Sequence, residues 1–233
     1  MNLQKWEMLL AESAPDSQCA FGHMANETYG GRNAVEIETG IFLYGLVRRF
    51  LPRVILETGT HMGFASACLA LALEDKAKDF PLLKTSRVLT IDCGEYEQSA
   101  ALREKLGLQE WIVPILADSS TYQYDYPRPI DMLFLDSDHG EEFVLKEFMN
   151  FFPHLSRERA VVLFHDTVID PREREAIARI FSEEKILREK YRGISYFPFR
   201  NLRGLDLILF SNEQFQEPYG RNLAGHFSSP KRL

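Results

Sequence analysis

The chain has 233 residues, of which 45% are hydrophobic and 26% charged, and its formal net charge is −7. This composition is typical of one globular domain, and the acidic balance argues against nucleic acid as a partner, since nonspecific binding needs a basic surface. No apolar run has the roughly 20 residues of a membrane-spanning helix, so no membrane partner is expected. Three scattered cysteines (Cys19, Cys68 and Cys93) and an N-terminus without a signal-peptide pattern predict a cytoplasmic location.

From the N-terminus, residues 3–12 are expected to form an amphipathic helix, residues 15–32 a loop or lid, and residues 34–50 a second helix. Short apolar runs then alternate with helical stretches. The predicted strands are 54–56, 88–91, 111–116, 132–135 and 161–164, and the predicted helices are 64–78, 96–106, 140–152 and 172–190. Such alternation predicts a parallel sheet covered by helices on both faces. Pro114 indicates that the third strand lies at an edge, because proline cannot complete a central ladder.

The chain's last two apolar runs differ from the others. Residues 194–199 and 205–210 are joined by only five residues, too few for a crossover helix, and should pair as an antiparallel hairpin. The predicted fold class is therefore α/β, a Rossmann-like, doubly wound, mostly parallel seven-stranded sheet with a C-terminal antiparallel hairpin. We expect a single domain over residues 1–233, with an N-terminal helical and lid segment (1–50), a cofactor-binding core (51–211) and a polar tail (212–233).

The segment Glu57-x-Gly59-x-x-x-Gly63 joins the first strand to the next helix. Gly59 can adopt a positive φ, and Gly63 lets the backbone approach a ligand or a neighbouring strand closely. A strand, a glycine turn and a helix N-terminus together predict a nucleotide-type pocket. The spacing differs from the Gly-x-Gly-x-x-Gly pattern of dinucleotide enzymes.

Acidic residues follow all five predicted parallel strands, where open α/β sheets bind ligands. One acid alone could equally be a turn residue or a helix cap. As a set, they predict a site in which Asp92 binds ribose hydroxyls, Asp118 accepts from an adenine amino group, and Glu57 suits a cationic amine. An amine-bearing nucleoside therefore fits better than NAD. The five acids are Glu57, Asp92, Asp118, Asp136 and Asp166.

Taken together and in order, these motifs resemble those of the class I S-adenosylmethionine-dependent methyltransferases. The resemblance covers residues of about 50 to 211 and includes the terminal hairpin. It implies S-adenosylmethionine as the cofactor. The residues that it implies for cofactor binding are Glu57, Gly59, Thr60, Gly63, Asp92, Asp118 and Ser119.

The second half of the predicted site comes from the fourth and fifth strands, whose ends should lie about 4.8 Å apart. Asp136, His165 and Asp166 are expected to converge there on one divalent cation, Mg²⁺ or Mn²⁺. His139, three residues after Asp136, has the ordinary pKa of a general base, so His139 and Asp136 are the predicted catalytic residues. The alternative that His165 and Asp166 form a purely structural corner stays open.

The Asp136-x-x-His139 and His165-Asp166 pairs resemble motifs of metal-dependent O-methyltransferases of the catechol, macrolide-sugar and cephalosporin-biosynthesis types. The sequence departs from those families at His165, where they commonly carry a carboxylate. Two other predictions concern surface residues. Residues 171–175 indicate a helix start with a solvated face. The candidates to border a substrate cleft, which no sequence pattern supports, are Tyr29, Arg32, Arg200 and Arg203.

The sequence thus predicts a metal-assisted O-methyltransferase that acts on a hydroxyl of a small molecule such as a sugar or natural product. Two alternatives stay open. One is an NAD-dependent oxidoreductase, against which Glu57 and the missing Gly-x-Gly argue. The other is a non-catalytic nucleoside-binding module on the same fold. The expected partner is the small hydroxylated substrate, and assembly into a homo-oligomer is left open.

Overall fold

The structure is a computed structural model that describes residues 2–13, 35–200 and 203–212. The predicted lid at 15–32 and nearly all of the predicted tail lie outside the described residues. The helices are α1 (Leu3–Ser13), α2 (Ile37–Phe50), α3 (Phe64–Ala77), α4 (Glu97–Lys105), α5 (Glu141–Phe151), α6 (Pro171–Ser182) and α7 (Glu184–Lys190), with short 3-10 helices η2 (Pro81–Thr85) and η3 (Phe152–His154). The strands are β1 (Val54–Thr58), β2 (Arg87–Asp92), β3 (Ile112–Leu116), β4 (Met132–Leu135), β5 (Arg159–His165), β6 (Gly193–Phe199) and β7 (Leu205–Ser211).

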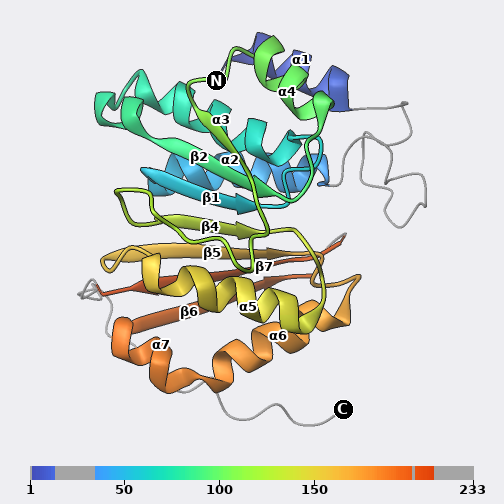
Figure 1. The fold of residues 1–233 in the computed structure, drawn as a ribbon. Coiled ribbons are helices and arrows are strands. Elements are labelled where there is room, and N and C mark those ends of the chain that lie inside the picture. The colour runs from blue at the N-terminus through green and yellow to red at the C-terminus, as the bar shows by residue number, and fades with distance from the viewer. Residues whose placement is uncertain (1, 14–34, 201–202, 213–233) are drawn as a thin grey trace.

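The seven strands form one sheet in the order β3-β2-β1-β4-β5-β7-β6 (Figure 1). Strands β1 to β5 pair in parallel with one another, whereas β7 pairs antiparallel with both β5 and β6. The predicted doubly wound sheet with a terminal antiparallel hairpin is therefore confirmed. Pro114 lies in β3 at the edge of the sheet, as predicted. At this edge, its missing N–H does not interrupt the hydrogen bonds between central strands.

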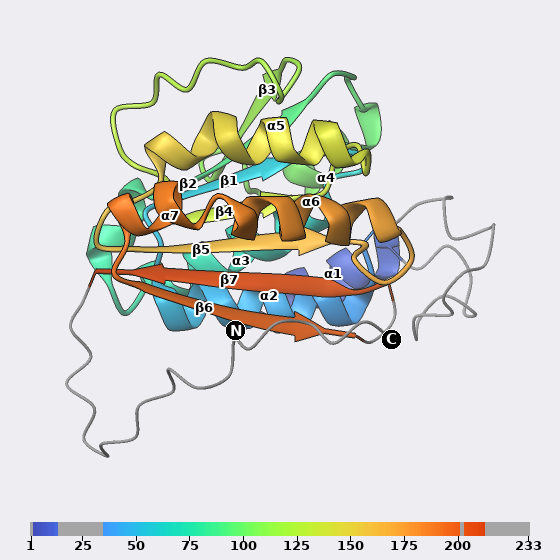
Figure 2. The same ribbon diagram turned by 90° about the horizontal axis from the view of Figure 1, so that it is seen from below.

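Helices cover both faces of the sheet and enclose a separate hydrophobic core on each (Figure 2). Helices α1 to α4 pack on one face, and α5, α6 and α7 pack on the other. Successive strand residues point to opposite faces, so Ile55 belongs to the first core and Leu56 to the second. Both faces are buried, which explains why the central strands are continuous apolar runs without a polar alternation.

The register of the strands brings distant loops to one edge of the sheet. Thr58 pairs with Leu135, and Leu135 pairs with Phe164, so the loops that follow β1, β4 and β5 are neighbours. The antiparallel strand β7 begins at the same edge, because Leu205 pairs with His165. The turn of the terminal hairpin therefore reaches the carboxyl edge of the parallel strands, beside the predicted catalytic and metal-binding residues.

The structure corrects one predicted element. The single helix expected over 172–190 is two helices, α6 and α7, which meet at Glu183 with a ψ of 32°. Helix α6 begins where proline and an Asp cap predict it, since Pro171 is its first residue and Asp170 accepts a hydrogen bond from the backbone N–H of Arg172 at 3.0 Å. Within the described part of the chain, none of the helices has the length and apolar character needed to cross a membrane.

Candidate active site at the carboxyl edge of the sheet

Two positions of the glycine loop after β1 can be occupied only by glycine. Gly59 has a φ of 83° and Gly63 a φ of 80°. A Cβ on Gly59 would lie 1.9 Å from the carbonyl oxygen of Asp136, and one on Gly63 would lie 2.7 Å from Oγ of Ser99. Both glycines are thus required for close approach of the loop to its neighbours. The loop lines a small cavity together with Val35 and Asp136.

Two predicted cofactor residues tie this loop to strand β2. The carboxylate of Asp92 accepts hydrogen bonds from the backbone N–H of His61 at 3.0 Å and of Gly94 at 2.9 Å. Oγ1 of Thr60 lies 2.6 Å from Oγ1 of Thr90. Asp92 therefore lies beside the glycine loop, half-buried and reachable by a ligand.

Asp118 and Ser119 follow β3, at the end of the predicted cofactor site that was assigned to adenine. Asp118 is exposed, and its Oδ1 accepts from the backbone N–H of Ser120 at 2.9 Å, which is an Asx turn. Ser119 is buried, and its carbonyl oxygen accepts from Nδ2 of Asn150 at 3.2 Å. The turn fixes the backbone here and leaves the exposed carboxylate of Asp118 open to solvent.

Glu57 is fully buried in β1 and is not among the described residues that line the small cavity. Burial raises the pKa of its carboxyl to about 8, although hydrogen bonds from Ser66 and Thr90 work in the opposite direction. Its Oε2 accepts a hydrogen bond from Ser66, whereas Oε1 has no partner among the described residues. At neutral pH, Glu57 is mostly protonated in the absence of a cation.

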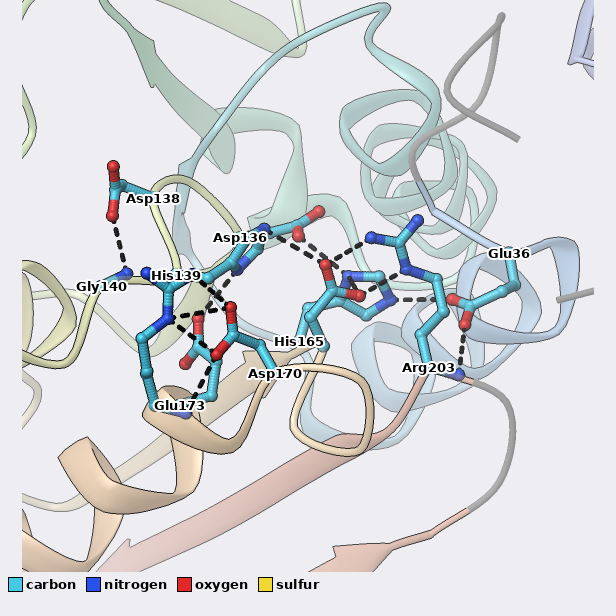
Figure 3. A network of polar contacts seen from close by, with 11 residues as sticks. Glu36, Asp136, Asp138, His139, Gly140, His165, Asp170, Glu173 and Arg203 are labelled. Carbon is cyan, nitrogen blue, oxygen red and sulfur yellow. Dashed lines mark hydrogen bonds and ion pairs between the residues drawn. The ribbon is translucent and has the colours of Figure 1, made fainter. Parts of the chain in front are cut away.

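The second predicted half-site does come together in space (Figure 3). One candidate ligand atom from each of Asp136, His165 and Asp166 lies within 4.8 Å of the others. Nδ1 of His165 is 2.9 Å from Oδ1 of Asp136 and 3.2 Å from Oδ1 of Asp166. Asp166 has a φ of 60°, an uncommon conformation for a residue with a side chain, and such strain is often found at functional sites.

Two residues that the sequence did not place in this cluster complete it. Glu36, just before α2, accepts from Nε2 of His165 at 2.7 Å and from the backbone N–H of Arg203 at 2.9 Å. Arg203, in the hairpin turn, donates from Nε and Nη2 to the two oxygens of Asp166, each at 2.5 Å. No local spacing links these residues to Asp136, so only the folded chain reveals them.

The charges of this cluster explain the pKa values of its members. Burial alone would raise the pKa of Glu36 and lower that of His165, but their mutual hydrogen bond and opposite charges outweigh burial. The pKa of Glu36 falls to about 2. The pKa of His165 rises well above its usual range, chiefly through the charge and hydrogen bond of Asp136, with Glu36 and Asp166 also contributing. His165 is therefore a buried imidazolium between carboxylates.

His139, the predicted base, lies between two acids. Its Nδ1 is 2.9 Å from Oε1 of Glu173 and its Nε2 is 3.1 Å from Oδ2 of Asp166. Burial acts to lower the pKa of His139, but the hydrogen bond to Glu173 and the charges of Asp166 and Asp136 raise it. The His139 side chain is 29% exposed, against 1% for His165 and Asp166, so within this cluster it is the group most accessible to a substrate.

Glu173 corrects the prediction that residues 171–175 form only a solvated helix start. Its side chain is 2% exposed and faces His139, whereas its neighbours Arg172 and Arg174 are exposed. Burial raises the pKa of Glu173 to about 7, against the effect of the hydrogen bond to His139. The sequence signal that could have found it is helical spacing, since Glu173 shares a face of α6 with the buried Ala176, Ile177 and Ile180.

A much larger cavity lies elsewhere, at the amino edge of the parallel strands. Its volume is about 1010 Å³, and its lining includes Arg53, Tyr124, Arg128 and His154. The predicted catalytic, cofactor and metal residues are not part of this lining. We therefore base the functional assignment on the chemistry at the carboxyl edge, where ligands bind in open α/β sheets.

The comparisons with known proteins agree with this location. Residues 56–167 match the family described as "Methyltransferase domain". This segment begins in β1 and ends just after Asp166, so it contains both the glycine loop and most of the acid cluster. The match covers just under half of the chain, and the fold is that of the solved methyltransferase structures described next.

Three solved structures illustrate the similarity of fold. An O-methyltransferase from Bacillus cereus in complex with SAH is 18% identical, with a TM-score of 0.61 over 89% of this chain and 90% of that chain. TomG from Streptomyces achromogenes, an O-methyltransferase of tomaymycin synthesis in complex with SAM, is 21% identical, with a TM-score of 0.58 over 91% and 99%. A putative caffeoyl-CoA O-methyltransferase from Staphylococcus aureus is 17% identical, with a TM-score of 0.58 over 90% and 100%.

One curated relative matches part of the chain. It is the uncharacterized protein y4gI of Sinorhizobium fredii (strain NBRC 101917 / NGR234), 32% identical over 136 residues. The match covers 56% of this chain and spans about 15% of the length of that relative.

Proposed function

We propose that this chain transfers a methyl group from S-adenosylmethionine to an oxygen atom of a small hydroxylated molecule, such as a sugar or natural product. The observation that carries the proposal is the position of the methyltransferase-family segment. Residues 56–167 include the glycine loop and the partly exposed His139, and both lie at the same edge of the sheet. A cytoplasmic location and a role without nucleic acid or membrane partners stay predictions, as does the question of a homo-oligomer.

The residues of the glycine loop suit the proposed cofactor. In this proposal, Gly59, Thr60 and Gly63 present backbone to it, Asp92 accepts from its ribose, and Asp118 with Ser119 lies at its adenine. The unpartnered Oε1 of Glu57 leaves a carboxylate near the loop for the amino group of the cofactor. When bound, the cofactor supplies a methyl group activated by a sulfonium. The protein must then position the acceptor oxygen and take up its proton.

We propose that His139 takes up that proton at Nε2. Glu173 contacts the other ring nitrogen and fixes the orientation of the ring, as an acid commonly does for a catalytic histidine. Nε2 lies 3.1 Å from Oδ2 of Asp166 in the present arrangement, so in this proposal the substrate hydroxyl takes the place of Asp166 beside an unprotonated Nε2. Glu173, with its pKa of about 7, can share the proton within the pair.

The predicted metal ion suits this arrangement less well. A histidine that ligates a metal must offer a lone pair, so one of its ring nitrogens has to be free of a proton. Both nitrogens of His165 contact carboxylate oxygens, and both oxygens of Asp166 accept from Arg203. The ligand atoms are close enough for a metal, but they are occupied by cationic side chains. The proposed mechanism therefore contains no metal step, and metal assistance stays a prediction of the sequence.

The proposed function is tested by a methyl-transfer assay with S-adenosylmethionine and a panel of sugars, phenols and other small alcohols. Formation of S-adenosylhomocysteine together with a methylated product, both detected by mass spectrometry, is expected for the wild type. His139→Asn should lose transfer while it still binds S-adenosylhomocysteine. His154→Asn is the matched control, because His154 lies at the opposite edge of the sheet and should be dispensable.

The same assay separates the alternatives. Binding of S-adenosylhomocysteine without transfer to any acceptor would favour the non-catalytic module. Tight binding of NADH in a fluorescence titration, without binding of S-adenosylhomocysteine, would favour the oxidoreductase and contradict the proposal.

A further inference from the structure

We propose that Arg203, together with His165, fills the place of a divalent cation in the acid cluster, so that methyl transfer by this chain needs no bound metal. The inference rests on the proposed function as far as it concerns transfer, whereas its statement on metal binding stands without it. Figure 3 shows the side chains of Arg203 and His165 close to Glu36 and Asp136. Both cations also contact Asp166, at 2.5 Å for Arg203 and 3.2 Å for His165.

The contact between Arg203 and Asp166 is bidentate, with two parallel hydrogen bonds of 2.5 Å. This is the strongest geometry available to a carboxylate and a protein cation. It uses Oδ1 and Oδ2 at once, and the Asp166 side chain is 1% exposed. A metal ion could therefore bind Asp166 only after Arg203 has moved away.

The backbone of Arg203 is fixed as firmly as its side chain. Its N–H donates to Glu36, and its carbonyl oxygen accepts from the backbone N–H of Val168 at 2.8 Å and of Ile169 at 3.2 Å. The next residue, Gly204, has a φ of 93°, and a Cβ there would lie 2.4 Å from the backbone nitrogen of Val168. The backbone around Arg203 thus holds its side chain over Asp166, and displacement of the arginine would break several hydrogen bonds.

His165 offers no free nitrogen to a metal either. Nδ1 contacts Asp136 and Asp166, and Nε2 contacts Glu36, and all of these partners are carboxylates that can only accept when ionised. A ring that donates from both nitrogens carries two protons and a positive charge. The residue that the sequence predicts as a metal ligand is thus a second internal cation.

The acids of the cluster have protein cations as partners without an added ion. The carboxylates of Glu36, Asp136 and Asp166 face the guanidinium of Arg203 and the ring of His165. A divalent cation in the same place would meet these positive groups and would be repelled. In a hard-ligand metal site, by contrast, the carboxylate oxygens bind the metal ion directly.

The inference is tested by titration of Mn²⁺ into the purified protein, with free Mn²⁺ measured by electron paramagnetic resonance. No saturable binding is expected for the wild type up to about 1 mM, the weak end of specific affinity. Arg203→Gln removes the internal cation and should bind Mn²⁺ at least about tenfold more tightly than the wild type. Arg203→Lys keeps the charge and should behave like the wild type.

Arg172→Gln is the matched control, since it removes a positive charge nearby without a contact to Asp166. Arg172 pairs with Asp170 and its side chain is 59% exposed. Its Mn²⁺ binding should equal that of the wild type. Thermal melting verifies that each variant is folded, and if Arg203→Gln does not fold, the wild-type titration alone decides.

A second arm measures methyl transfer by the wild type in EDTA and in added Mn²⁺ or Mg²⁺. Equal turnover within about twofold in both conditions is expected. Saturable binding of Mn²⁺ by the wild type, or loss of turnover in EDTA that Mn²⁺ restores, would overturn the inference. If no acceptor is methylated under any condition, the proposed function fails, but the Mn²⁺ titration still decides whether the cluster binds a metal.

Discussion

Glu36 and His165 are 129 positions apart in the chain, yet Oε2 of Glu36 lies 2.7 Å from Nε2 of His165. The other oxygen of Glu36 accepts from the backbone N–H of Arg203. One buried carboxylate therefore joins the start of α2, the end of β5 and the terminal hairpin (Figure 3). Substitution of Glu36 therefore tests how much the acid cluster contributes to the free energy of unfolding.

Glu36→Gln should destabilise the protein by about 2 kcal/mol at pH 7, because a charge-assisted hydrogen bond is lost and His165 keeps a buried charge. The pKa of Glu36 is lowered to about 2, so its contribution is present above its ordinary pKa of 4.5 and is lost as the pH falls toward 2. Urea unfolding at several pH values measures this. Glu110→Gln, at an exposed position, is the control and should change little. An equal effect of both substitutions would contradict the prediction.

Gly59→Ala should abolish binding of S-adenosylhomocysteine and destabilise the fold, since its Cβ would meet the backbone of Asp136 at 1.9 Å with a φ of 83°. A loss of at least about 2 kcal/mol is expected from strain and overpacking. Gly45→Ala is the matched control. Gly45 is exposed in α2, and a Cβ there would meet nothing within 4 Å, so the substitution should stabilise by up to about 1 kcal/mol. Calorimetry and thermal melting provide the two readouts.

Glu57 should make the stability of the ligand-free protein fall as the pH rises. Its folded pKa of about 8 lies above its ordinary value of 4.5, so between these values the folded state holds a proton that the unfolded state releases. The fall should be on the order of a few kcal/mol. Glu57→Gln mimics the protonated acid and should lack this component. The free energy of unfolding of both proteins is measured with urea at several pH values. If it changes with pH in the same way for both, Glu57 has an ordinary pKa and the prediction is contradicted.

Glu173→Gln should lower methyl transfer by about tenfold to a hundredfold, less than the full contribution of a general base. Because Glu173 raises the pKa of His139, its loss should also move the rise of kcat with pH to lower pH. Glu175→Gln, exposed on the same helix, is the control. A reduced kcat with an unshifted pH profile would mean that Glu173 supports the fold without orienting the base.

Much of the fold follows from local patterns. Apolar runs that alternate with helical stretches identified the parallel strands, and Pro114 and the short connection before Leu205 identified the edge strand and the hairpin. These signals work because they depend on neighbouring residues in the chain. The sequence did not predict the break between α6 and α7, because no proline or glycine marks the end of a helix near Glu183.

Only part of the site could be predicted, because some of its residues are far from the others in the sequence. Acids that end parallel strands meet at one edge, so Asp136 and Asp166 could be placed together from the sequence. The other members of the cluster could not, because Arg203 lies in the turn before β7 and Glu36 lies just before α2, both far from the acids in the chain. Without these partners, the acids suggested a metal. With them, the cluster has its own positive charges.

The central claim is that this chain binds the methyl-donor cofactor at the glycine loop. Calorimetric titration of the wild type with S-adenosylhomocysteine tests it most directly, with Gly59→Ala and Gly45→Ala measured in parallel. The account predicts saturable binding by the wild type and by Gly45→Ala, and none by Gly59→Ala. Absence of binding to the folded wild type, or equal binding by all three proteins, would contradict it.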